Sequence, residues 1–269
     1  MHVAEAARAA PGDGGTLEES VGVVDDLIAG LPDGALEDVL VAAFWTAVVA
    51  HSQGRRRCGL ASTPREDDHH YGRGPAIRDA GTLTERGARD LAGLARSASP
   101  MEAAVGMAAI NSLLPLSEEW WEPLNAEEII ATQGAGKRVA LVGHFPFVPR
   151  LKERVGALWV LEQHPREEDL PVSAAPEVIP QADVLALSGT TLINHTFEGL
   201  VALRRPGALV VVLGPSTPLS PVLFAYGVDV ISGAVVENVD AVVRVVRQGG
   251  NFLQVRPHGV RLVTMRRKR

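Results

Sequence analysis

Two ionisable side chains in the second half of the chain could support acid–base chemistry. His144 follows an apolar run and lies between Gly143 and Phe145, which are candidate ligand-binding residues, and Glu162 follows the next apolar run. Imidazole and carboxyl groups are the usual general acids and bases of enzymes. A packed loop histidine and a surface acid are the structural alternatives. A site at this position therefore depends on whether the fold brings the two runs together.

A polar segment after the third apolar run has the composition of an anion-binding turn. Its residues are Ser188, Gly189, Thr190 and Thr191. Hydroxyls and free backbone N–H groups at the start of a helix favour negative charge. Asn194 follows Thr191 by three residues, so its side chain could reach a ligand bound at this turn. His195 is a third candidate acid or base. Helix capping without a ligand is the alternative.

A second hydroxyl-rich turn follows the fourth apolar run. Gly214 and Pro215 precede Ser216 and Thr217 there, and Pro218 comes next. Serine or threonine before a proline is a natural start for a helix, so a rigid capped turn would explain this segment without a ligand. The functional hypothesis is a second set of donors that faces the first turn, with Gly214, Ser216 and Thr217 as ligand-binding residues.

The spacing of apolar runs predicts the elements that position these residues. Short apolar runs alternate with helical segments in a way that is typical of a parallel sheet covered on both faces. The predicted strands are 138–142, 157–161, 184–187, 209–213 and 228–231, and the predicted helices are 148–155, 191–203, 218–226 and 236–248. Right-handed crossovers give a doubly wound, Rossmann-like α/β domain, in which ligands bind beyond the carboxyl ends of the strands. The G-x-G-x-x-G dinucleotide fingerprint is absent after the first strand.

The first half of the chain predicts a small α+β domain. Its expected elements are a helix at 17–31, strands at 39–49 and 58–63 that form a hairpin, and helices at 84–97 and 100–114. The expected organisation is a flexible tail at 1–16, an α+β domain at 17–122, a connector at 123–136 and the α/β domain at 137–269. The long apolar strand with Phe44 and Trp45 predicts an exposed edge or face and hence a homo-oligomer, most simply a C2 dimer.

Composition excludes several classes of protein. The chain has 269 residues, 46% of them hydrophobic, and a formal net charge of −6, which disfavours nucleic-acid binding. No apolar run reaches the length of about 18 residues that a membrane span needs, and no signal peptide is visible, so we expect a cytoplasmic protein without membrane partners. The basic end of the chain, residues 265–269, is expected to be a solvated tail.

The remaining candidate features are weaker. Cys58 is the one cysteine, so no intrachain disulfide can form, and the arginines before it could lower its pKa, although a structural thiol is the alternative. The cluster Asp67, Asp68, His69 and His70 has metal-ligand residue types but no spaced partner, so no metal site is predicted there.

Several segments together resemble the family described as "putative heavy-metal chelation", long classed as domains of unknown function. They are residues 59–63 (GLAST), 102–111 (EAAVGMAAIN), 187–194 (LSGTTLIN), 213–221 (LGPSTPLSP) and 226–229 (YGVD). The resemblance covers roughly residues 17–250. It implies an enolase-N-terminal-like α+β domain, then a Rossmann-like domain, with a ligand cleft between them.

Three hypotheses of function follow. The first is an enzyme on a small anionic metabolite, which eliminates or cyclises its substrate with loss of a phosphate or sulfate group and uses His144, Glu162 and His195. The second is a protein that binds a heavy metal or metal complex, as the resemblance implies. The third is a protein that binds a nucleoside cofactor similar to S-adenosylmethionine, with Glu162 on the ribose. The sequence identifies no cofactor.

Overall fold

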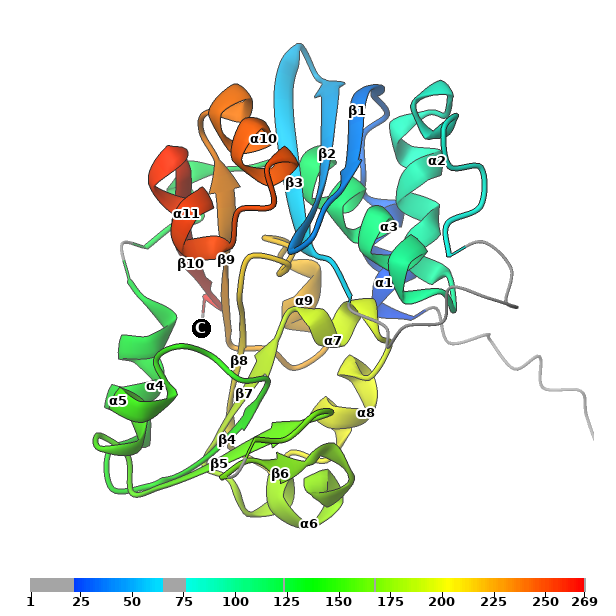
Figure 1. The fold of residues 1–269 in the computed structure, drawn as a ribbon. Coiled ribbons are helices and arrows are strands. Elements are labelled where there is room, and N and C mark those ends of the chain that lie inside the picture. Colours follow the sequence, from blue (N-terminus) through cyan, green and yellow to red (C-terminus); the bar gives the residue numbers. More distant parts are fainter. Residues whose placement is uncertain (1–21, 65–75, 123, 167, 269) are drawn as a thin grey trace, which may run out of the picture.

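The computed structural model describes residues 22–64, 76–122, 124–166 and 168–268, which form two sheets with helices around them (Figure 1). The predicted tail at 1–16 and the cluster at 67–70 lie outside the described residues. No helix in the described ranges is long and apolar enough to cross a membrane.

The large sheet contains all five predicted strands in parallel orientation. In spatial order it consists of β10 (Val260–Arg266), β9 (Val230–Val236), β8 (Leu209–Leu213), β7 (Val184–Ser188), β4 (Arg138–Val142), β5 (Ala157–Glu162) and β6 (Leu170–Pro171). Apart from β10, which pairs antiparallel with β9, its strands follow the Rossmann order 3-2-1-4-5-6. The predicted α/β class is therefore confirmed, with two edge strands that the apolar runs did not reveal.

Helices cover both faces of the large sheet. On one face, α4 (Ala126–Gly134) and α5 (Val148–Lys152) pack on alternate side chains of the strands, such as Leu141 and Ala186. On the other face lie α6 (Ala175–Val178), α7 (Thr190–Ile193), α8 (Phe197–Ala202) and α9 (Val222–Ala225). The expected connector at 123–136 thus contains α4, whose Ile129 and Ile130 are buried in the sheet's core.

The small sheet is an antiparallel meander rather than one hairpin. Its strands are β1 (Ala35–Val41), β2 (Trp45–Ser52) and β3 (Arg55–Ser62). The single strand predicted at 39–49 is wrong, because Ala42 and Phe44 form a tight turn between β1 and β2, closed by a bond from the Ala42 N–H to the Trp45 carbonyl. Apolar residues continue through this turn, so the sequence pattern did not show the break.

Helix α3 (Pro100–Leu113) covers one face of the small sheet. It begins at the predicted position, with Ser99 as the N-cap and Pro100 in the first turn. Gly59 of β3 and Gly106 of α3 permit very close packing, since a Cβ on either would collide with backbone atoms of Ala108 or Ala95. The second helical segment of this part, α2 (Ala88–Ala92), is shorter than predicted and packs beside α3.

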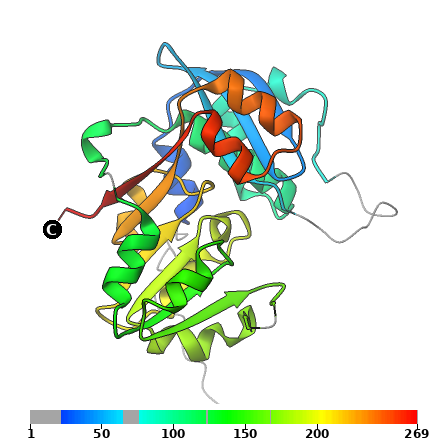
Figure 2. The same cartoon turned by 60° about the vertical axis from the view of Figure 1, so that its left-hand side comes forward.

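The opposite face of the small sheet is covered by the other end of the chain. Helices α10 (Val239–Arg247) and α11 (Phe252–Val255) connect β9 to β10 and lie against the strands of the small sheet (Figure 2). Their side chains Val242 and Val246 pack in one cluster with Ala47 and Val49 of β2. The apolar face that was expected to be exposed is therefore covered by helices of the same chain. The homo-oligomer stays a prediction, but this face no longer supports it.

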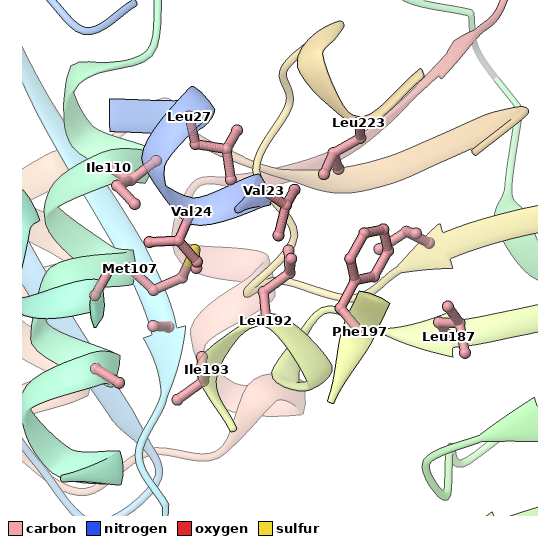
Figure 3. Packing of buried hydrophobic residues seen from close by; sticks show 14 of the residues in the cluster. Val23, Val24, Leu27, Met107, Ile110, Leu187, Leu192, Ile193, Phe197 and Leu223 are labelled. Atoms are coloured by element: carbon pink, nitrogen blue, oxygen red, sulfur yellow. The ribbon is translucent and has the colours of Figure 1, made fainter. Parts of the chain in front are cut away.

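A continuous core links the two sheets. Helix α1 (Val23–Ala29) places Val23 and Leu27 between Ile110 of α3 and Leu223 of α9 (Figure 3). Because this cluster extends from one sheet to the other, the two parts of the chain share one hydrophobic core.

Some predicted element boundaries need correction. The helix predicted at 191–203 is divided into α7 and α8 at His195, whose φ of 57° interrupts helical geometry. The helices predicted at 148–155 and 218–226 are reduced to α5 and α9, and that predicted at 236–248 begins later, as α10. Part of the predicted basic tail is strand β10, in which Met265 is buried.

A buried carboxylate generates the first prediction. The Glu102 side chain is 2% exposed and accepts hydrogen bonds from Arg78 and from the Ser97 hydroxyl at 2.5 Å. The Arg78 guanidinium chiefly lowers the pKa of Glu102 from 4.5 to about 2. We expect Glu102→Gln to lower the free energy of unfolding at pH 7 by about 1–3 kcal/mol.

The pH dependence follows from the direction of this shift. A carboxyl whose pKa is lowered by folding adds stability above its unfolded-state pKa, near 4.5, and this contribution is lost as the pH falls toward 2. Urea unfolding between pH 7 and pH 3 measures the difference between parent and variant. The exposed Glu128, paired with Arg154, is the control, and Glu128→Gln should change stability little. An equal effect of both variants would contradict the prediction.

Candidate functional site

A cavity of about 360 Å³ lies at the carboxyl ends of the central strands of the large sheet. The loops that follow β4, β5, β7 and β8 form its wall on one side. Strand β4 and its neighbour β7 are the point at which the strand order reverses, where open α/β sheets bind their ligands. Trp45, Ser62 and Phe252 complete the wall from the small sheet and α11.

His144 is one of the residues that line this cavity, and its imidazole is paired with a carboxylate. Its Nδ1 is 3.0 Å and 3.2 Å from the two carboxylate oxygens of Asp169, whose side chain is only 3% exposed. Asp169 lies in the loop between β5 and β6 and does not line this cavity. Together with His144 it lines a neighbouring cavity of about 540 Å³. Since Nδ1 is occupied, Nε2 is the ring nitrogen left for a ligand.

Glu162 lies in the same wall, but its carboxylate is held by the backbone. One oxygen accepts the His144 N–H at 2.6 Å and the other accepts the Gln163 N–H at 3.1 Å. These bonds tie the loop after β4 to the end of β5. The structure thus brings Glu162 and His144 together as predicted, and it shows Glu162 as an anchor for the histidine loop.

The turn after β7 contributes hydroxyl groups to the cavity. The Ser188 oxygen accepts from the Thr190 hydroxyl at 2.8 Å and from the Thr190 N–H at 3.3 Å. Thr191 donates its hydroxyl to the Ser188 carbonyl and is buried. Because Ser188 acts as acceptor toward Thr190, its own O–H proton is left to donate to a ligand.

Asn194 lines the cavity, whereas His195 does not. The Asn194 side-chain oxygen accepts from the Thr196 hydroxyl at 2.7 Å, so its amide N–H groups are left for other partners. His195 Nε2 instead lies 2.9 Å from the carbonyl oxygen of Ser97, next to the buried Glu102. The structure therefore separates this third candidate acid or base from the other two.

In the turn after β8, too, only one of the two predicted hydroxyl residues lines the cavity. Ser216 lines the cavity, and its hydroxyl oxygen accepts the Ser62 N–H from β3 at 2.8 Å. Thr217 is 1% exposed and is not part of the wall. Thr217 lies very close to Gly189. A Cβ added to Gly189 would be 2.5 Å from the Thr217 hydroxyl oxygen and 2.6 Å from the Thr217 backbone nitrogen.

Aromatic side chains form the apolar part of the wall. Trp45 and Phe252 contact each other, with ring centroids 5.7 Å apart, and Phe145 stacks on Phe147 at 5.1 Å. Of these cavity residues and the His144 partner, Phe145 is a predicted site residue, whereas Trp45, Phe252 and Asp169 were not predicted as site residues. A contact between β2 and α11 has no local sequence signal, and Asp169 lies in a charged stretch without apolar spacing.

The described residues do not offer a complete cage for a metal ion. Within this part of the chain, no three His, Cys, Asp or Glu side chains lie together where they could hold one. Cys58 is not an activated thiol, because burial raises its pKa to about 12 in spite of the adjacent arginines. The donors of the cavity are hydroxyl, amide and imidazole groups, which suit an organic ligand better than a bare ion.

Fold and cavity together define an α/β protein with a ligand-sized cleft between a Rossmann-like sheet and a small antiparallel sheet. The chain belongs to the DUF364 family, described as "Putative heavy-metal chelation", which matches residues 125–265; residues 24–114 match DUF4213, which has the same description. The family resemblance inferred from the sequence is thus confirmed.

Two solved structures share the fold over 91% of this chain. A crystal structure of a DUF364 protein of unknown function from Desulfitobacterium hafniense has 25% sequence identity and a TM-score of 0.76, covering 91% of this chain and 98% of that one. One from Pyrococcus horikoshii, at 20% identity and a TM-score of 0.77, covers the same shares. An uncharacterized protein of Methanocaldococcus jannaschii is 27% identical over 213 residues, which are 76% of this chain and 79% of that protein.

The close approach at Gly189 generates the second prediction. We expect Gly189→Ala to push the turn after β7 away from Thr217 and to lower the free energy of unfolding by about 1–3 kcal/mol. Gly199 in α8 has open space around its Cβ position, so Gly199→Ala should raise stability by about 0.5–1 kcal/mol. Thermal or urea unfolding measures both variants. Equal stability of the two would show that the contact between the turns is not tight.

Proposed function

We propose that the cavity binds a small organic anion and that His144 exchanges a proton with it. The main support is that residues with hydrogen-bond donors left free by their neighbours line the same cavity as His144, whose ring has one nitrogen already paired. Ser188 and Asn194 supply the donors, and His144 supplies the titratable group. Such donors at a strand end near a helix start favour an anionic group.

The ligand also has an apolar part. Trp45, Phe145 and Phe252 present ring surfaces to the same cavity that Ser188 and Asn194 line. A volume of about 360 Å³ lies at the lower end of the range for small-molecule sites, so a single metabolite suits it better than a dinucleotide. The nucleoside hypothesis is the less favoured one, because both Glu162 oxygens already accept backbone N–H groups.

The proposed chemistry is elimination or cyclisation with loss of a phosphate or sulfate group. His144 accepts a proton from the substrate, and the electron pair of that bond forms the new double bond or ring bond. The phosphate or sulfate leaves with the electron pair of the bond that breaks, and the donors of the Ser188 turn stabilise its charge. Glu162 fixes the loop that presents His144.

Heavy-metal chelation is the second candidate, and family membership is the observation that favours it. The donor set of the described residues fits a metal only if the metal arrives with ligands of its own. Calorimetric titration with Ni²⁺, Cu²⁺ or Zn²⁺ alone tests this candidate. Tight stoichiometric binding of a bare ion would favour chelation over the anion site.

The third prediction tests the anion site with inorganic phosphate and sulfate as probes. Asn194→Ala removes the amide donors, and Thr190→Val removes the hydroxyl that orients Ser188. Each should weaken binding of the probe by about 1 kcal/mol, or roughly fivefold, without a change in fold. Calorimetry or NMR titration gives the dissociation constants.

Thr132→Val is the matched control, because Thr132 is an exposed threonine of α4, outside the cavity wall. It should leave binding of phosphate unchanged. If the Asn194 and Thr190 variants bind the probes as the parent does, the donors of this turn are only helix caps, and the proposal fails.

A further inference from the structure

Asp169 and His144 form a pair whose geometry determines which imidazole nitrogen can react. Both Asp169 oxygens lie within 3.2 Å of His144 Nδ1, and the carboxylate is almost completely buried. A carboxylate only accepts hydrogen bonds, so Nδ1 must carry the proton of the neutral ring. The lone pair of the neutral imidazole is then on Nε2.

We infer that Asp169 is a positioning residue that holds His144 as the Nδ1–H tautomer, so that its Nε2 acts as a base toward the bound ligand. This inference rests on the proposed function and deepens it, because it states that the proton first moves from the ligand to His144 Nε2. The substrate class it implies is an anion with a weakly acidic O–H, N–H or C–H group that can reach Nε2.

The surroundings fix both members of the pair. Asp169 also accepts the Arg166 N–H at 3.2 Å, which holds its carboxylate in the loop between β5 and β6. The backbone of His144 is held by Glu162 at 2.6 Å, so the ring and its main chain are anchored by two different carboxylates. Neither anchor belongs to the turn after β7, where the anionic group is proposed to bind.

Long-range proton–nitrogen NMR on the full chain with labelled histidine tests the inference without any ligand. The chain has 8 histidines, and His144→Gln identifies the His144 signals by their loss. At a pH where the ring is neutral, the parent should show His144 protonated on Nδ1. Asp169→Ala removes the acceptor that holds the Nδ1–H proton and should shift His144 toward the Nε2–H tautomer.

Glu168→Gln is the control, because Glu168 is the exposed neighbour of Asp169 and pairs with Lys152 instead. It should leave the tautomer unchanged. A neutral parent His144 with its proton on Nε2 would overturn the inference, and so would an unchanged tautomer in folded Asp169→Ala protein. If the Ala variant does not fold, the parent spectrum alone still decides between the two tautomers.

The same samples separate this inference from the proposed function. Loss of phosphate binding in the Asn194 variant, with the Nδ1–H tautomer present in the parent, supports both. If the parent shows the expected tautomer but binds neither phosphate nor sulfate, the anion site is refuted and the positioning role of Asp169 remains supported.

Discussion

The small sheet has two apolar faces, and the need to bury both determines how this chain is arranged. Side chains of β2 alternate, so that Val48 and Ala50 face α3 while Ala47 and Val49 face the opposite side. Burial of an aliphatic side chain of valine size is worth about 1.5–3 kcal/mol, so an uncovered face would be costly. Helices α10 and α11 supply the second cover, and they can do so because the chain returns from β9 before it adds β10. The cleft is a consequence of this return, since it brings Phe252 beside Trp45 above the strand ends of the large sheet.

Polar contacts between the two parts of the chain then fix the geometry of the cleft. Ser216 binds the backbone of β3 at Ser62, and the Asn111 amide donates to carbonyls on both sides, at Leu60 and Ser216. Farther away, the Tyr226 hydroxyl donates to Asp26; burial and this neighbouring carboxylate raise the pKa of Tyr226. His195 belongs to this set of linking contacts through Ser97. A histidine selected for its chemical type thus connects the two parts of the structure instead of serving the cavity.

The extent to which the sequence predicts this structure depends on how far apart the interacting residues lie. The loops at the ends of β4, β5, β7 and β8 could be predicted, because a short continuous apolar run between helices has few alternatives to a buried parallel strand. Strands β1 and β10 mix apolar and charged residues, such as Glu37 and Asp38 in β1 and Arg261 and Arg266 in β10. This composition is equally typical of a solvated segment. Asp169 could not be assigned to His144, because it lies 25 positions later in the sequence, beyond a whole strand and a loop. The local chemistry of the site was therefore visible in the sequence, whereas its partners depend on tertiary contacts.

The absence of the dinucleotide fingerprint has a structural counterpart at the strand-order reversal. Gly143 adopts a φ of 105° after β4, as a glycine at this turn often does, but the space it opens is not left for a pyrophosphate. A Cβ on Gly143 would be 2.9 Å from the Ser188 Cβ and 3.3 Å from the Phe145 ring, so the glycine serves the contact between the turns after β4 and β7. Phe145 also lies 3.7 Å from the corresponding position of Gly214. In a dinucleotide-binding protein, glycines at these turns let the phosphates approach the backbone. In this chain, Gly143 and Gly214 instead let the loops after β4, β7 and β8 converge around the Phe145 ring. His144 follows Gly143 directly and lines the cavity at this convergence, and a cavity of about 360 Å³ suits the proposed small anion better than a dinucleotide.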